Sequence, residues 1–207
     1  MNRYLMEFIG TFFLVLIIGC TVIPGTIGPL APLAIGLGLT ALIYAGGVIS
    51  TAHYNPAVTL AFWLRGAFDP KEILPYIVAQ VTAAISGALL AVYLCGPGEP
   101  MAMADVPRIL VAEILFTFAL VFVILSVATS KATAGNSFYG IAIGLVVTAG
   151  AFAVGGISGA AFNPAVLIAF ALMKLAPIGA LWPHLIGALV GAALGVAGFR
   201  ATHPEDA

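Results

Sequence analysis

The sequence has 207 residues, of which 62% are apolar and 7% are charged, and its net charge is −1. An ordinary soluble domain carries about a quarter charged residues, and a soluble core of this length could not bury so much apolar surface, so the composition predicts a protein that resides in lipid. The seven Lys and Arg residues form no basic stripe, which argues against nucleic-acid binding.

Six apolar runs of about twenty residues, the length that crosses a bilayer, follow one another along the chain. They are Tyr4–Ile23, Leu30–Ile49, Ile73–Leu94, Pro107–Thr129, Ser137–Val154 and Pro177–Phe199. Two shorter runs, Pro56–Leu64 and Pro164–Met173, cover only about half a bilayer at about 1.5 Å per residue and are predicted to be re-entrant half-helices. We therefore expect an all-α membrane protein that forms a single domain over residues 1–207.

The cationic residues set the expected orientation, because cytoplasmic loops carry an excess of Lys and Arg. If the N-terminus lies in the cytoplasm, only Arg108 and Lys174 fall on the extracellular side of the membrane. The remaining cations then fall on the cytoplasmic side: Arg3, Arg65, Lys71, Lys131 and Arg200. Both termini are predicted to be cytoplasmic.

The chain also repeats itself at an offset of about 108 residues. The run Glu7-Phe-Ile-Gly-Thr has a counterpart in Glu113-Ile-Leu-Phe-Thr, and Asn55-Pro-Ala-Val returns as Asn163-Pro-Ala-Val. Each half, approximately 4–94 and 107–199, therefore holds three spans and one half-helix. Because three is odd, the second half enters the membrane from the opposite side, and in such inverted repeats the functional site lies near the midplane.

The paired Asn-Pro dipeptides each follow a segment rich in small residues, Gly46–Tyr54 and Gly155–Phe162, which we expect to be irregular. Asn is a strong N-cap, and Pro is preset for the first helical turn. Asn55 and Asn163 should therefore cap half-helices that meet head to head, each with about half a positive elementary charge at its N-terminus. Such a ring of amide donors favours a neutral, oxygen-bearing solute and opposes cations. The expected midplane residues are Asn55, Pro56, Ala57, Asn163, Pro164 and Ala165.

Over residues 3–200 the sequence resembles the aquaporin family, also called the major intrinsic proteins. The resemblance rests on Glu7 with Gly10-Thr-Phe-Phe13, on His53-Tyr-Asn-Pro-Ala-Val-Thr59, and on Asn163-Pro-Ala165. It implies six tilted helices around a narrow pore, two half-helices that meet at the centre of the pore, and a homotetramer with one pore per subunit. It also implies passive conduction of water or small neutral solutes, with protons excluded at the Asn pair.

The resemblance places a second constriction, on the extracellular side of the Asn pair, at Ile35, Ala151, Ala160 and Val166. In the family the position of Val166 is nearly always Arg, and that of Ala151 is His in water-selective members. A ring of small or aliphatic side chains is wider, and it can exclude water by dewetting. It also lacks a fixed cation, which at about 4 Å would oppose a passing cation by about 4 kcal/mol. We therefore expect a solute channel rather than a strict water channel.

The expected cargo is a compact neutral solute: a glycerol-like polyol, urea or an undissociated metalloid acid such as arsenous acid. A small-residue filter without Arg resembles the bacterial aquaporins associated with arsenic resistance, which suggests arsenite, methylated arsenicals and a bacterial inner membrane. The alternatives are a strict water channel, an anion-permeable channel and a secondary transporter. The few ionisable residues and the short connections argue against a transporter, and the lack of a nucleophile–base set argues against an intramembrane enzyme.

The two re-entrant segments need hydrogen-bond partners of their own. Glu7 and Glu113 lie well inside spans at matched repeat positions, and we interpret them as acceptors for loop N–H groups rather than as proton-transfer groups. His53 is expected to orient the first loop through buried hydrogen bonds, with direct contact to the solute as the alternative. The carbonyls of residues 51–54 and 159–162 are expected to form the pore wall, in particular those of Ala52, His53, Tyr54, Gly159, Ala161 and Phe162.

The remaining polar and sulfur-containing residues predict no separate chemistry. Gln80 matches a polar position of the family on the third span, and His184 is matched with it as its repeat partner. His184 is interpreted as a core or interface residue with its hydrogen bonds satisfied, with a pH-sensitive packing role as the alternative. Cys20 and Cys95 lie in apolar runs and are interpreted as core residues. No cluster of His, Cys and carboxylates indicates a metal ion, and no cofactor is expected.

Overall fold

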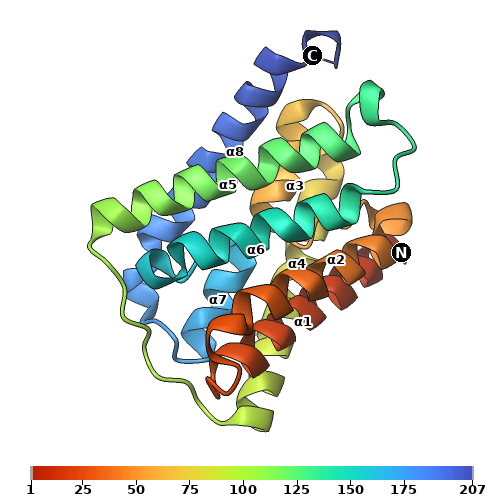
Figure 1. Cartoon of the computed structure of the whole chain (residues 1–207). Coiled ribbons are helices and arrows are strands. Elements are labelled where there is room, and N and C mark those ends of the chain that lie inside the picture. Colours follow the sequence, from red (N-terminus) through yellow and green to blue (C-terminus); the bar gives the residue numbers. More distant parts are fainter. Residues whose placement is uncertain (1, 207) are drawn as a thin grey trace.

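The computed structural model describes residues 2–206, and over that range it consists of helices and connecting segments without a strand (Figure 1). Six helices are long and apolar enough to cross a membrane, and two are about half that length. The long helices are α1 (Asn2–Val22), α2 (Ala31–Ser50), α4 (Pro70–Cys95), α5 (Val106–Ala128), α6 (Tyr139–Ser158) and α8 (Trp182–Thr202). The half-length helices are α3 (Pro56–Arg65) and α7 (Pro164–Leu172). The all-α membrane fold expected from the sequence is confirmed.

Proline and side-chain caps mark where several helices begin. Asp69 accepts the Lys71 N–H at the start of α4, and Asp105 accepts the Arg108 N–H at the start of α5. Because Pro has no N–H, it fits the first helical turn, where that donor would have no partner within the helix. The sixth span begins at Trp182 instead of Pro177, because residues Ile178–Ala180 form a separate 3-10 turn.

The expected irregular segments are shorter than the sequence predicts. Helix α2 continues through Ser50 and α6 continues through Ser158, so Gly46 and Gly155 lie inside regular helix. The reason is visible at Gly46, where an added Cβ would collide with the Tyr54 hydroxyl. The glycine admits a neighbouring side chain and does not end the helix, whose backbone stays hydrogen-bonded within the bundle.

The two halves of the chain pack as equivalent helix pairs. Helix α1 packs along α4 and α5 packs along α8, while α2 and α6 cross between the halves (Figure 1). A Cβ on Gly36 would lie 2.7 Å from the Gly144 carbonyl oxygen, and a Cβ on Gly144 would lie 2.5 Å from the Gly36 carbonyl oxygen. Small residues therefore let the backbones of α2 and α6 touch at a point that is related by the repeat.

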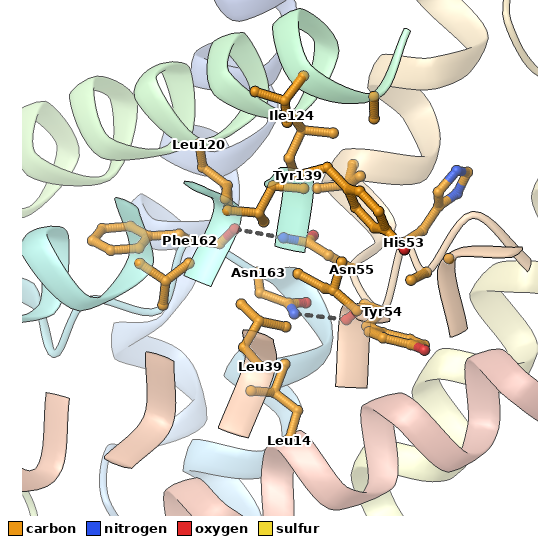
Figure 2. A pocket seen from close by; sticks show the side chains of 18 of the residues that line it. Leu14, Leu39, His53, Tyr54, Asn55, Leu120, Ile124, Tyr139, Phe162 and Asn163 are labelled. Carbon is orange, nitrogen blue, oxygen red and sulfur yellow. Dashed lines mark hydrogen bonds between the residues drawn. The ribbon is translucent and has the colours of Figure 1, made fainter. Parts of the chain in front are cut away.

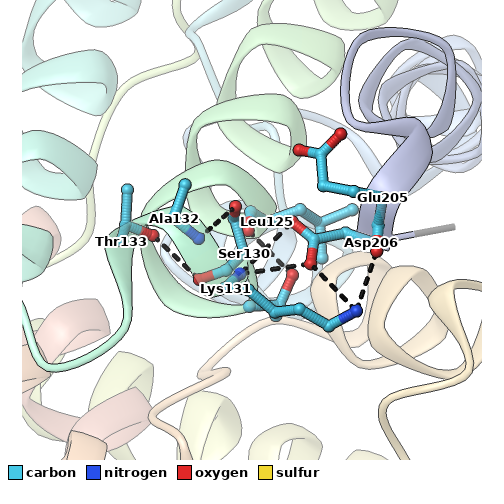
Figure 3. A network of polar contacts seen from close by, with 8 residues as sticks. Leu125, Ser130, Lys131, Ala132, Thr133, Glu205 and Asp206 are labelled. Carbon is cyan, nitrogen blue, oxygen red and sulfur yellow. Dashed lines mark hydrogen bonds and ion pairs between the residues drawn. The ribbon is translucent and has the colours of Figure 1, made fainter.

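The last described segment, Pro204–Asp206, folds back on the connection between α5 and α6 (Figure 3). Both carboxylate oxygens of Asp206 lie 3.2 Å from the backbone nitrogen of Lys131, which donates to them. Lys131 Nζ donates to the Glu205 carbonyl at 2.8 Å. The Ser130 hydroxyl, first among the causes, and the Lys131 N–H lower the pKa of Asp206.

We expect Asp206→Asn to loosen the α5–α6 connection, because an amide cannot replace the charge-assisted contact with Lys131. A carboxylate whose pKa is lowered in the folded state stabilises that state above the ordinary Asp pKa of about 3.9. This stabilisation is lost as the pH falls through the lower folded pKa. Amide exchange of residues 129–137 in detergent-solubilised protein should be several-fold faster in Asp206→Asn at neutral pH.

The matched control is Glu205→Gln, because the contact of Glu205 with Lys131 is made by its backbone carbonyl. This variant should exchange like the unmodified protein. Equal exchange rates in all three proteins at neutral pH would show that the Asp206 contact does not hold the connection.

Candidate functional site

A cavity of about 370 Å³ runs through the bundle beside the starts of the two half-helices (Figure 2). On four helices its lining residues recur every four positions, which places them on one face of each helix. The stripe on α2 runs from Ile35 to Gly47, a rise of about 18 Å, so the cavity extends along most of the helix. The four stripes are Leu14, Ile18 and Val22 on α1; Ile35, Leu39, Ile43 and Gly47 on α2; Leu120 and Ile124 on α5; and Tyr139, Ile143, Val147 and Ala151 on α6.

The two Asn side chains cap the half-helices and also connect them. Asn55 Oδ1 accepts the Ala57 N–H at 2.9 Å, and Asn163 Oδ1 accepts the Ala165 N–H at 2.9 Å. Asn55 Nδ2 donates to the Phe162 carbonyl and Asn163 Nδ2 donates to the Tyr54 carbonyl, both at 2.9 Å (Figure 2). Since an amide nitrogen carries two hydrogens, each Asn keeps one N–H for the cavity that it lines.

The segments before the two Asn residues have an unusual backbone. Thr51, Ala52 and Tyr54 in the first loop have positive φ angles of 62°, 50° and 49°. Ala160 and Phe162 in the second loop have φ angles of 53° and 48°. Outside glycine, this left-handed conformation costs about 1–2 kcal/mol per residue, so both loops need strong anchoring.

This curled backbone leaves carbonyl groups available on both loops. Residues 51–54 and 159–162 all line the cavity. The carbonyls of Tyr54 and Phe162 each accept an Asn amide, whereas those of residues 51–53 and 159–161 accept no hydrogen bond from any described residue. The carbonyls of Tyr54 and Phe162 are therefore occupied by the Asn amides, and three further carbonyls on each loop remain available as acceptors in the cavity wall.

Glu7 anchors the first loop from inside the bundle, where its side chain is fully buried. Its carboxylate accepts the backbone N–H groups of His53 at 2.9 Å and Tyr54 at 2.7 Å. It also accepts the Ser50 hydroxyl at 2.7 Å and the Gln80 amide at 2.8 Å. Four donors therefore converge on one carboxylate and hold the strained turn.

Glu113 anchors the second loop in the same way but with one donor fewer. It accepts the Ser158 hydroxyl at 2.6 Å and the N–H groups of Ala161 at 3.1 Å and Phe162 at 2.8 Å. A counterpart of the Gln80 contact is missing from the described residues, because the position one repeat after Gln80 is Ala188.

The pairing of Gln80 with His184 that we inferred from the sequence is wrong. The Tyr76 hydroxyl donates to the Ser50 carbonyl at 3.0 Å, and His184 Nε2 lies 2.8 Å from the equivalent Ser158 carbonyl. His184 is therefore the counterpart of Tyr76. Because a carbonyl only accepts hydrogen bonds, this contact requires the proton on Nε2.

His53 lies at the edge of the cavity inside an aromatic cluster. Its ring centroid is 4.3 Å from that of Phe62 and 4.9 Å from that of Phe68. Nε2 lies 2.9 Å from the Thr51 hydroxyl and Nδ1 lies 3.2 Å from the Thr59 hydroxyl. Both ring nitrogens are therefore engaged within the protein, and the ring braces the first loop.

The four residues assigned to the constriction all line the cavity and come from four segments. Ile35 is on α2, Ala151 on α6, Ala160 in the second loop, and Val166 on α7. Over residues 2–206 the cavity lining holds no Asp, Glu, Lys or Arg. Sequence reasoning missed the apolar stripes on the four long helices, and it also missed Met101 and Phe170. Phe170 lies one turn after Val166 on the same face of α7, whereas nothing in the sequence marked Met101.

Known proteins are similar to this chain over most of its length. The profile of the major intrinsic protein family matches residues 1–199. A probable NIP-type aquaporin from Nicotiana alata is 34% identical over 210 residues, which cover 94% of this chain and 75% of that protein. Aquaporin AqpM from Methanothermobacter marburgensis is 36% identical over 177 residues, which cover 78% of this chain and 72% of that protein.

The fold has a close counterpart among solved structures. The aquaglyceroporin from Plasmodium falciparum superimposes with a TM-score of 0.85 and covers 99% of this chain and 98% of its own. The two sequences are 22% identical, so the likeness establishes the shared arrangement of helices.

We expect Glu7→Gln and Glu113→Gln each to destabilise the protein by about 1–3 kcal/mol, because a Gln amide nitrogen would face N–H donors that then lack an acceptor. Thermal unfolding in detergent measures this loss. The control is Glu99→Gln, an exposed position between α4 and α5 that should leave stability unchanged. A variant that folds with full stability but loses only a pH-driven flux would instead assign the carboxylate to proton transfer.

Proposed function

The chain belongs to the major intrinsic protein family, a family of multi-pass membrane channels and not of enzymes, and we propose that it conducts small neutral solutes larger than water. One observation carries this proposal: a cavity along the bundle whose lining holds no charged side chain among the described residues. Its assigned constriction contains two alanines, at Ala151 and Ala160, beside Ile35 and Val166. Small side chains leave room for solutes of several heavy atoms.

The chemistry of the wall supports a solute that carries both hydrogen-bond donors and acceptors. One N–H of each Asn is available to a solute oxygen, and the carbonyls of 51–53 and 159–161 are available to solute hydroxyl or amide hydrogens. Hydrocarbon side chains, among them Leu14, Leu39 and Leu120, lie around the Asn pair (Figure 2). Glycerol-like polyols, urea and undissociated metalloid acids have this mixed character. Arsenous acid and methylated arsenicals belong to the same class.

Charge separates the solutes that fit from those that do not. The half-helices α3 and α7 direct their N-termini at the cavity centre, and each terminus carries about half a positive elementary charge. A cation that meets this potential finds no carboxylate to bind among the described residues of the cavity lining. An ion of either sign would also have to lose water against an apolar wall, which costs several kcal/mol.

Anion conduction is the second candidate, because the midplane is positive and the assigned constriction is neutral. Currents in asymmetric salt across a planar bilayer distinguish it from neutral-solute conduction. A reversal potential set by the anion gradient would support this second candidate and overturn the neutral-solute proposal.

The oligomeric state, the membrane and the orientation of the chain form the next part of the proposal. We propose that the protein is a homotetramer in a bacterial inner membrane, with both termini in the cytoplasm. The excess of Lys and Arg on the expected cytoplasmic side supports the orientation. Large apolar side chains exposed on the outer surface, such as Leu89 and Leu115, support contact with lipid or a second subunit.

We expect purified protein in liposomes to conduct glycerol, urea and arsenite, with a flux that rises in proportion to the gradient. Light scattering reports swelling in each solute, and empty liposomes give the background. Flux that saturates at modest concentration would indicate a transporter. Fast water flow without any solute flux would indicate a strict water channel.

We expect Val166→Arg to lower glycerol and urea flux by about tenfold or more, equivalent to about 1.4 kcal/mol in the barrier, because the side chain fills the constriction. Water is smaller and should be less affected. The matched variant Val166→Met adds length without charge and separates bulk from electrostatics. Unchanged glycerol flux in a folded Val166→Arg variant would show that Val166 does not form part of the constriction.

A further inference from the structure

The connection between α4 and α5, residues 96–105, lies along one end of the bundle (Figure 1). Three backbone hydrogen bonds hold it against the segment that follows α7 and against the end of α6. Gly98 N donates to the Met173 carbonyl at 2.9 Å, and Met101 N donates to the Leu175 carbonyl at 2.8 Å. Ala104 N donates to the Ile157 carbonyl at 2.9 Å. The connection is therefore fastened on both sides of Met101.

This fastening places the Met101 side chain in the wall of the cavity. Its methyl carbon lies 2.9 Å from the point where a Cβ on Gly159 would stand, and its sulfur lies 3.7 Å from that point. Gly159 has a φ angle of 78°, which suits glycine, and its missing side chain leaves the space that Met101 occupies. Met101 therefore lies next to the residue that precedes Ala160 of the constriction.

The side chains near Met101 in the assigned constriction are small. Ala151 and Ala160 contribute a methyl group each, whereas Met101 contributes an unbranched thioether with three rotatable bonds. Such a side chain fills irregular gaps and adapts to what it contacts. It does so without adding a charge or a strong hydrogen-bonding group to the wall.

We propose that Met101 is a specificity-determining residue, the fifth side chain of the constriction, and that it sets the upper size limit of the solutes that pass. The proposal rests on the proposed function and deepens it. The four other members bound the opening from α2, α6, α7 and the second loop. Met101 closes it from the α4–α5 connection.

The test compares two polyols of different size, glycerol and xylitol, in proteoliposomes. Met101→Ala should raise the ratio of xylitol to glycerol permeability by about tenfold, the lower end of the discrimination that one methylene gives in an apolar pocket. Met101→Phe should lower the same ratio, and Met101→Leu, which keeps the bulk, should preserve it. Opposite changes in two variants keep the test decisive even if one of them folds poorly.

The matched control is Met103→Ala, in the same connection, because Met103 is absent from the cavity lining. It should leave the ratio unchanged. If the unmodified protein conducts glycerol and neither Met101→Ala nor Met101→Phe shifts the ratio, Met101 does not set the size limit and the proposed function stands. If the unmodified protein conducts no solute, the proposed function fails and this inference fails with it.

Discussion

Backbone that leaves helical conformation inside a membrane must find every hydrogen-bond partner within the protein. This constraint explains why two carboxylates, Glu7 and Glu113, are buried in the centre of an apolar bundle. Each accepts two N–H groups from a loop whose residues hold left-handed conformations. With these donors occupied by the carboxylates, the loop carbonyls remain as the groups that a solute can bind. The same short segments therefore direct their N–H groups at the buried carboxylates and leave their carbonyls for the cavity.

The Asn pair adds the second requirement, which is that the two loops fit each other. Each Asn uses its oxygen to cap its own half-helix and one N–H to hold the opposite loop. The starts of α3 and α7 are fixed at one place along the cavity as a result. At that place the described part of the wall holds no charged side chain, and the positive ends of the two half-helices face the cavity.

Much of this arrangement could be predicted from the sequence, because lipid imposes strong rules. Run length identified the spans, and the Asn-Pro pairs located the starts of both half-helices to the residue. The irregular segments begin later than their small residues indicate, because Gly46 lies within α2 and accommodates the Tyr54 hydroxyl. His184 was paired with the wrong residue, because degenerate small-residue spans do not fix their own register. Met101 has no periodic signal, and only the folded connection brings it to the cavity.

The cross-connection between the loops also limits how the duplicated halves can diverge. The Asn55 amide is satisfied by a carbonyl at Phe162, and the Asn163 amide by a carbonyl at Tyr54. A change at either Asn therefore leaves an unpaired carbonyl in the other copy, more than half the chain away in sequence. The two loops are therefore coupled at this point, and a substitution in one copy is expected to disturb the backbone of both.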